Sequence, residues 1–333
     1  MRQREARIES YLTEAGWQGA SRASLEGDAS FRRYVRLTRD NGAQAMLMDA
    51  PPPQEDVQPF VGISNRLLSM GLSAPQILAK DIDTGLLLLE DFGDATYTRM
   101  LRSDGDEAAL YQLATETLIA LHSRFSDLGD IPPYDDTRLL DEAALLVDWF
   151  LPALRGQETP DSLRKEYLGL WRDVLVLARG VPATLVLRDY HVDNLMHLSD
   201  RQGVSACGLL DFQDAVIGPS SYDLVSLLED ARRDVPAPLA ATCLAQYLSA
   251  FPDLDSEAFR ASYAILGAQR SAKIVGIFTR LDWRDGKPAY LKHIPRVFRW
   301  LLGDLEHPAL AELKIWFDRE IPFVDRTAPT HKG

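Results

Sequence analysis

The chain has 333 residues, of which 46% are apolar and 26% are charged, and this composition is that of a packed globular protein rather than a disordered or fibrous one. A formal net charge of −13 disfavours nonspecific binding to nucleic acid or anionic membranes. The cysteines, Cys207 and Cys243, are too few for a disulfide framework and lack the spacing of a zinc site.

The N-terminal segment is charged from Arg2 onward and has no continuous apolar stretch, so we expect no secretory signal. No apolar run reaches the length of a membrane-spanning helix. These features predict a cytoplasmic protein with reduced thiols, with neither a membrane nor a nucleic acid as its partner.

The first ninety residues predict a mixed sheet with helices, because segments of alternating polarity are interspersed with segments of helical period. The elements are, in chain order, a helix over 2–15, a strand pair over 31–37 and 43–48, a helix over 57–70 and a second strand pair within 76–90. Short turns that contain Gly42 and Gly85 join the strands of each pair.

Beyond Asp94 the pattern changes to long helical periods, and strands are expected in one place only, at 195–198 and 204–210. The predicted helices cover 107–125, 139–154, 161–179, 221–231, 238–250 and 256–280. We therefore expect an α+β protein with two lobes, a small β-rich lobe over 1–93 and a larger, mainly helical lobe over 94–333.

The stretch LRDYHVDNL has the spacing of the protein-kinase catalytic loop H-R-D-x-x-x-x-N, with Asp189 followed five positions later by Asn194 and with Leu187 in place of the histidine. Asp211 ends the hairpin that follows, and an antiparallel hairpin returns its end beside its beginning. Asn194 and Asp211 then suit Mg²⁺, which takes further oxygen ligands from phosphates. Asp189 is left to accept the proton of an attacking hydroxyl group. The alternative is that these residues only cap a loop and end a strand.

The triplet from Asp91 to Gly93 matches the Asp-Phe-Gly sequence with which protein kinases hold magnesium. In kinases that aspartate follows the catalytic loop, whereas Asp91 precedes Asp189. Asp211 occupies the expected place, so we interpret Asp211, and not Asp91, as the metal-binding aspartate.

These motifs, together with GDASFRRY, MDAPP, LLLEDFGD and QRSAKIVGIFTRL, resemble the aminoglycoside and choline phosphotransferase superfamily, which shares the protein-kinase fold. The resemblance covers nearly the whole chain and is greatest to the bacterial anomeric kinases for N-acetylmuramate and N-acetylglucosamine, which serve peptidoglycan recycling. It implies an enzyme that uses ATP and Mg²⁺ to phosphorylate the C1 hydroxyl of a small amino sugar, with no obligatory protein partner evident.

The resemblance also implies which residues bind the nucleotide. They are Leu89, Glu90 and Asp91 at the hinge between the lobes, and Asp28, Ala29 and Ser30 at the tip of the loop that covers the phosphates. That loop has one glycine and not the Gly-x-Gly-x-x-Gly pattern of kinases, so an ordinary hairpin turn is an equally good interpretation of the sequence alone.

One departure from the kinase pattern concerns the lysine of the third strand, which pairs with phosphates. The expected strand has Met46 and Met48 instead, and Lys80 is the only lysine of the first lobe. Arg32 and Arg33 are candidates for the missing positive charge, unless both are solvated surface residues.

The resemblance further implies that Asp223 is the buried aspartate that binds the backbone of the catalytic loop, although a carboxylate at a helix N-terminus is also favourable by itself. Residues 260–300 have nine Lys or Arg and two acidic residues, a net charge of +7. Arg270 and Lys273 share a helix face there, and we expect them to bind the carboxylate of N-acetylmuramate. Most such charges are only solvated.

Two alternative functions remain at this point. An aminoglycoside or amino-alcohol kinase would need carboxylates or an aromatic cage for its cationic substrate. A nucleotide-binding pseudokinase is favoured by the missing lysine, but the set of Asp189, Asn194 and Asp211 argues against it.

Overall fold

The computed structural model describes residues 2–25, 31–103, 105–126 and 129–329. By their internal contacts they form two compact units, Met1–Thr117 with Asp193–Asp214 and Leu118–Val192 with Ala215–Gly333. The chain therefore leaves the first unit, returns to it for one hairpin and leaves it again. The lobe boundary expected after residue 93 stays a prediction, because these units are defined by contacts and not by function. Among the described helices, none is long and apolar enough to cross a membrane.

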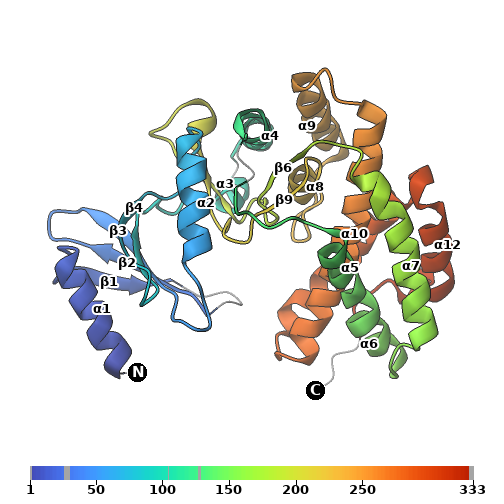
Figure 1. The fold of residues 1–333 in the computed structure, drawn as a ribbon, viewed down its shortest axis with the longest axis horizontal. Helices are drawn as coiled ribbons and strands as arrows, with labels where there is room; N and C mark the ends of the chain where they lie inside the picture. Colours follow the sequence, from blue (N-terminus) through green and yellow to red (C-terminus); the bar gives the residue numbers. More distant parts are fainter. Residues whose placement is uncertain (1, 26–30, 104, 127–128, 330–333) are drawn as a thin grey trace. The chain divides into compact units, whose positions relative to one another are not determined.

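The first unit is built on a sheet (Figure 1), which in the described residues has five strands, all antiparallel, in the order β1-β2-β3-β5-β4. The strands are β1 (Ser21–Ser24), β2 (Arg33–Thr38), β3 (Gln44–Asp49), β4 (Ile77–Asp81) and β5 (Leu86–Leu89). The helices that accompany them are α1 (Arg2–Glu14), α2 (Gln58–Ser69), α3 (Tyr97–Arg102) and the start of α4 (Glu107–Arg124). The hairpin of β7 (Leu195–His197) and β8 (Cys207–Leu209) completes the unit, with a 3₁₀ turn over Gly203–Ala206 between its strands.

The two faces of this sheet contact different parts of the unit, because successive side chains of a strand point to opposite sides. Leu37, Leu47 and Leu88 pack against Leu12 and its neighbours on α1 in one apolar core. The residues between them in the strands lie on the opposite face. This period of two decides which strand residues reach the pocket described below.

The second unit is mainly helical. Its elements are α5 (Asp136–Leu145), a π-helical turn (Leu146–Phe150), α6 (Leu151–Arg155), α7 (Asp161–Ala178), β6 (Ala183–Val186), β9 (Val216–Pro219), α8 (Tyr222–Leu228), α9 (Ala237–Ala250), α10 (Ser256–Trp283), α11 (Ile294–Leu305) and α12 (Ala311–Glu320). Short 3₁₀ turns cover Pro288–His293, Pro308–Leu310 and Phe323–Asp325.

Helix α10 is the central element of this unit, with α5, α7, α8 and α11 packed against it. Most of its residues from Ala264 to Leu281 are buried, including Gln269, Arg270 and Lys273. Gly276 lets α10 approach α5 closely, because an added Cβ would collide with the backbone of Leu145. A buried helix that contains charged residues must pair them with partners of the same unit.

The structure confirms the α+β fold with a β-rich start and a helical continuation, and it corrects three details. The sheet is antiparallel and not mixed. Strands occur in a second place beyond residue 94, since β6 pairs with β9 directly before the catalytic loop. The single helix expected over 139–154 is interrupted by the π-helical turn, which periodicity does not reveal.

Candidate active site

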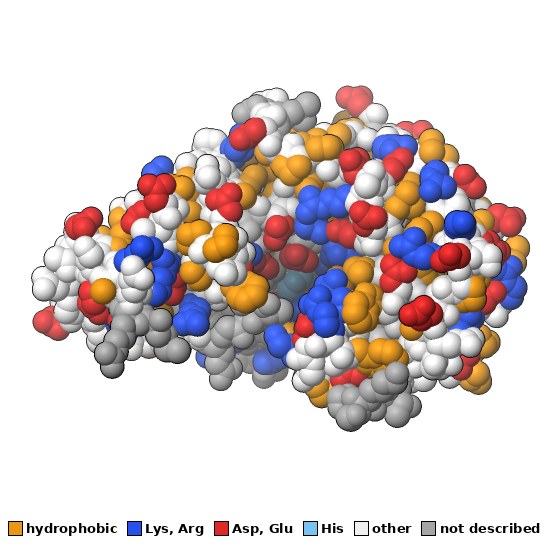
Figure 2. Space-filling model, turned by 60° about the horizontal axis from the view of Figure 1, so that its bottom comes forward, with side chains coloured by type: hydrophobic (Ala, Val, Ile, Leu, Met, Phe, Trp, Pro, Cys, Tyr) orange, Lys and Arg blue, Asp and Glu red, His pale blue; other side chains and the backbone are white. Residues whose placement is uncertain are grey.

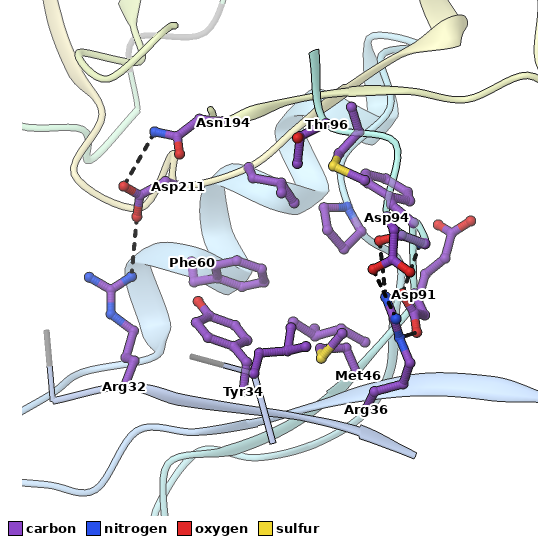
Figure 3. A pocket seen from close by; sticks show the side chains of 18 of the residues that line it. Arg32, Tyr34, Arg36, Met46, Phe60, Asp91, Asp94, Thr96, Asn194 and Asp211 are labelled. Carbon is purple, nitrogen blue, oxygen red and sulfur yellow. Dashed lines mark hydrogen bonds and ion pairs between the residues drawn. The ribbon is translucent and has the colours of Figure 1, made fainter. Parts of the chain in front are cut away.

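A pocket of about 540 Å³ lies in the first unit, between the sheet face opposite α1, the chain that follows β5 and the hairpin of β7 and β8 (Figure 3). Its apolar wall includes Tyr34 of β2, Met46 of β3, Leu89 of β5 and Phe60 of α2. Phe60 is held in place by stacking on Phe212, with ring centroids 4.9 Å apart. A slot with aromatic and thioether walls suits a flat heteroaromatic ring.

The opposite end of the pocket is polar. Asn194 Nδ2 lies 3.5 Å from Asp211 Oδ2, and Arg32 Nη1 lies 3.8 Å from Asp211 Oδ1. Figure 3 shows Asp211 between these two partners. The hairpin of β7 and β8 thus brings the predicted pair together, as antiparallel geometry requires. Oxygen is the ligand that Mg²⁺ prefers, so Asn194 Oδ1 and the Asp211 carboxylate form a suitable donor set.

Asp211 has a positive φ of 58°, a conformation that is uncommon outside glycine. Gln213 Nε2 donates to Asp211 Oδ1 at 2.9 Å and so helps to orient the carboxylate. A backbone conformation of this kind costs about 1 to 3 kcal/mol and persists only where the surroundings hold it.

Arg32 and Arg33, the two candidates for the missing positive charge, are the residue directly before β2 and the first residue of β2, and their side chains have different surroundings. Arg32 lines the pocket, where its guanidinium contacts Glu55 at 3.1 Å in addition to Asp211. Arg33 is exposed and does not line the pocket. The structure therefore brings Arg32 alone of the two to the predicted metal-binding pair.

Asp91 is engaged by Arg36, which donates to its two oxygens at 2.5 and 3.0 Å. Arg36 also donates to the Gly93 carbonyl and to Asp94, both at 3.0 Å. Arg36 thus connects β2 with the segment that follows β5. The Asp91 side chain is only 3% exposed. Such a carboxylate serves as a structural anion, which agrees with the interpretation that Asp91 is not the metal ligand.

The other predicted nucleotide-binding residues differ in what the structure says of them. Leu89 and Glu90 line the pocket, and the Glu90 N–H donates to the Gln76 carbonyl at 2.8 Å. The Glu90 carboxylate binds Arg201. Asp28, Ala29 and Ser30 lie outside the described residues, so their predicted role at the phosphates stays a prediction.

The predicted catalytic loop begins in the second unit, directly after β6. The Asp189 N–H donates to the Leu187 carbonyl at 2.9 Å, and Arg188 between them has a φ of 70°. This is a γ-turn with a positive central φ, which is rare and strained. Asp223 holds it from α8 by accepting the N–H groups of Leu187 at 2.6 Å and of Arg188 at 2.8 Å. The predicted contact between Asp223 and the loop backbone is thus present.

The Asp223 carboxylate is fully buried, and this burial raises its pKa to about 7, although the two N–H groups oppose the rise. The Leu187 N–H is buried and therefore needs an acceptor. Asp223 Oδ2 accepts the Leu187 N–H, and Asp223 Oδ1 accepts the Arg188 N–H.

Asp189 is itself held by α10. Arg270 Nη1 lies 3.8 Å from Asp189 Oδ1 and donates to the Arg188 carbonyl at 3.2 Å. Burial raises the pKa of Asp189, but the positive charges around it, those of Arg270 and Lys273 foremost, together lower it by more, so that this pKa lies below its ordinary value. Asp189 is therefore ionised at neutral pH, as a group that accepts a proton must be.

Lys273 lies one turn after Arg270 and is also buried. Its Nζ lies 3.1 Å from Oε1 of Glu142 on α5. The same carboxylate binds the Arg188 guanidinium and the Tyr134 hydroxyl group. The cations of this network lower the pKa of Glu142 below its ordinary value, against the effect of its burial.

The remaining positive charges of residues 260–300 do not form one basic surface. Arg284 pairs with Asp285 at 2.7 Å, and Arg296 and Arg299 pair with Asp234 at 2.8 and 2.6 Å. Figure 2 shows acidic and basic side chains intermixed on the face of the molecule that it presents. The expectation that Arg270 and Lys273 bind a substrate carboxylate stays a prediction, since each already faces an acidic residue.

Comparison with known proteins shows the family of the chain. Residues 22–260 match the family described as a phosphotransferase enzyme family. The chain belongs to this family. Among its relatives is a protein of Caulobacter vibrioides, named N-acetylmuramate/N-acetylglucosamine kinase, which is 38% identical over 97% of this chain and 98% of its own. A protein of Pseudomonas aeruginosa with the same name is 39% identical over 90% of this chain and 89% of its own.

Solved structures with the same fold are more distant in sequence. A choline/ethanolamine kinase family protein from Mesorhizobium loti is 16% identical with a TM-score of 0.62, and it covers 95% of this chain and 99% of its own. An ADP-bound aminoglycoside phosphotransferase is 15% identical with a TM-score of 0.60, over 93% of this chain and 99% of its own. At this identity the likeness shows the fold alone.

Several residues of this phosphotransferase were not predicted as parts of the site. Tyr34 and Arg36 alternate with apolar residues in β2, a pattern that identifies the polar face of a strand but not the pocket beneath it. Glu142 gives no signal, because it lies in the middle of an amphipathic helix and gains its role only when α5 meets α10.

Proposed function

We propose that this protein transfers the γ-phosphoryl group of ATP to the C1 hydroxyl of N-acetylmuramate and N-acetylglucosamine. The observation that carries the proposal is the pairing of Asn194 with Asp211 beside Arg32, in a chain whose predicted catalytic loop is held through its backbone by Asp223. In the reaction the C1 oxygen bonds to the γ-phosphorus, the bond from that phosphorus to the bridging oxygen of ADP breaks, and Asp189 accepts the hydroxyl proton.

The pocket of the first unit is the proposed nucleotide site. The slot between Tyr34 and Phe60 suits adenine, and Leu89 and Glu90 border it. Arg32 replaces the missing lysine as the positive charge for the phosphates. Asn194 and Asp211 would hold Mg²⁺, which when bound neutralises charge on the phosphate oxygens.

The substrate proposal is supported by the relatives, which are named as kinases of these two sugars over nearly the full length of this chain. Arg270 and Lys273 remain candidates to bind the lactyl carboxylate of N-acetylmuramate. We place the activity in the cytoplasm, where ATP is present, in the recycling of amino sugars from peptidoglycan.

The test is the ATP-dependent conversion of each sugar, with the position of the phosphate determined by phosphorus NMR. We expect a C1 phosphate from both sugars. Asp189→Asn should lower kcat by on the order of a hundredfold or more and leave nucleotide binding intact, because the amide cannot accept the proton. Absence of a C1 phosphate with the wild-type protein, or a normal kcat in the variant, would refute the proposal.

A further inference from the structure

The strained turn that presents Asp189 is held on every side by the second unit. Asp223 accepts hydrogen bonds from the N–H groups of Leu187 and Arg188. Arg270 donates to the Arg188 carbonyl at 3.2 Å. The peptide groups on both sides of the positive φ therefore have partners on α8 and α10. A conformation of this kind persists only where such contacts over-determine it.

Arg270 is built into this arrangement. It is 6% exposed, and its guanidinium contacts the Tyr222 hydroxyl at 3.4 Å and lies over the Tyr222 ring, 5.7 Å from the centroid. All three contacts involve one nitrogen atom: Nη1 lies near the Arg188 carbonyl, the Tyr222 hydroxyl and the Asp189 carboxylate. A side chain that is this buried and is fixed by these contacts orients the groups that it contacts.

We infer that Arg270 is a positioning residue of the phosphotransfer reaction, which holds the turn at Arg188 and keeps the Asp189 carboxylate in place as an anion. The inference rests on the proposed function. It assigns Arg270 to the catalytic base, and it removes Arg270 from the candidates for recognition of the substrate carboxylate.

The two roles make different predictions for kinetics. A residue that positions the base acts equally on both sugars and changes kcat. A residue that binds the lactyl carboxylate acts on N-acetylmuramate, which has this group, and spares N-acetylglucosamine, which lacks it. Removal of a positive charge beside Asp189 also raises the pKa of this carboxylate, so that the acidic limb of kcat/KM moves to higher pH.

The experiment compares Arg270→Met and Arg270→Lys with Arg260→Met, a matched control at an exposed position of the same helix. Steady-state kinetics with both sugars between pH 5 and 9 are combined with nucleotide binding and thermal melting. Arg270→Met should lower kcat by about a hundredfold with both sugars and move the acidic limb to higher pH. Arg270→Lys keeps the charge without the planar fork, so its kcat should fall by about tenfold with a smaller movement of the limb.

Arg260→Met should behave as the wild type. If Arg270→Met does not fold, the lysine variant decides between the two roles. A rise of KM confined to N-acetylmuramate, with an unchanged acidic limb, would overturn the inference, as would a wild-type kcat in both variants. A wild-type protein that phosphorylates neither sugar would instead refute the proposed function.

Discussion

Arg32 and Arg33 are neighbours in the chain with the same charge, but Arg32 directly precedes β2 and lines the pocket, whereas Arg33 is the first residue of β2 and is exposed. Arg32, Tyr34 and Arg36 point to the pocket side, whereas Val35 and Leu37 alternate with them and pack toward α1. Arg32 is the residue that reaches the Asp211 carboxylate. The alternation of side chains between the two sides of the sheet thus makes Arg32, and not Arg33, the candidate to bind phosphates.

We predict that Arg32→Ala raises the KM for ATP by about ten- to a hundredfold, the range for loss of a charge-assisted hydrogen bond of about 1.5 to 3 kcal/mol. Arg33→Ala is the matched control and should stay within about twofold of the wild type, because exposed charges contribute little. Arg32→Ala also removes the partner of Glu55, so melting curves of both variants should accompany the kinetics. Equal effects of the two substitutions would contradict the assignment of Arg32.

At the scale of elements, α8, α10 and α11 meet at a buried acidic pair. Asp304 of α11 lies against Gly267 of α10, where an added Cβ would collide with its carboxylate. Burial raises the pKa of Glu229, at the end of α8, to about 7, although Asp304, Tyr263 and Arg270 oppose the rise. Burial and the nearby Glu229 raise the pKa of Asp304 well above its ordinary value. The pair therefore keeps a proton at neutral pH.

This pair predicts a pH dependence of stability. Between the unfolded pKa near 4.5 and the folded pKa near 7 for Glu229, the folded protein binds more protons than the unfolded chain, so stability falls as the pH rises. We expect the wild type to lose at least about 1 kcal/mol of unfolding free energy from pH 6 to pH 8 through this pair. Asp304→Asn supplies a permanent neutral donor and should reduce this loss, as measured by urea denaturation.

The exposed Asp253 provides the control substitution to Asn, which should leave the slope of stability against pH as it is in the wild type. The same slope in Asp304→Asn and the wild type would mean that the two carboxyl groups do not share a proton.

At the scale of the whole molecule, the chain contributes to the pocket from two distant segments, since Asn194 and Asp211 return to the unit that contains β1 to β5. A ligand that binds this pocket binds the folded protein and not the unfolded chain. We therefore predict that Mg-ATP at about a hundred times its Kd stabilises the protein by about 2.7 kcal/mol. Thermal melting with and without a chelator measures the part that depends on magnesium.

Two variants separate the aspartates in the same assay. Asp211→Ala should lose the magnesium-dependent stabilisation, because it removes the proposed ligand. Asp91→Asn should keep it, since Arg36 occupies both Asp91 oxygens. A magnesium dependence that changes in Asp91→Asn and not in Asp211→Ala would show that the metal aspartate had been assigned incorrectly.

The sequence by itself determined the features that depend on nearby residues. Alternation identified β2, turns beside apolar segments identified β3 to β5, and helical periods identified most helices, because these signals depend on nearby residues. The meeting of Asn194 and Asp211 was also predictable, since they flank a single hairpin whose geometry returns one end to the other. The order of the motifs was enough to prefer Asp211 over Asp91 as the metal aspartate.

Only the tertiary structure decided the features that join distant segments. The choice of Arg32 over Arg33 required the side of the sheet on which the pocket lies, and strand alternation alone does not give it. The strand β6 is short and pairs with β9, thirty residues further on, so no local sequence pattern predicts it. The positive charge of Arg270 was visible in the sequence, but its partners at Arg188 and Asp189 lie about eighty residues away. A buried cation needs a partner of opposite charge, but burial alone does not specify which acidic residue this is. The packing of the helices determines it.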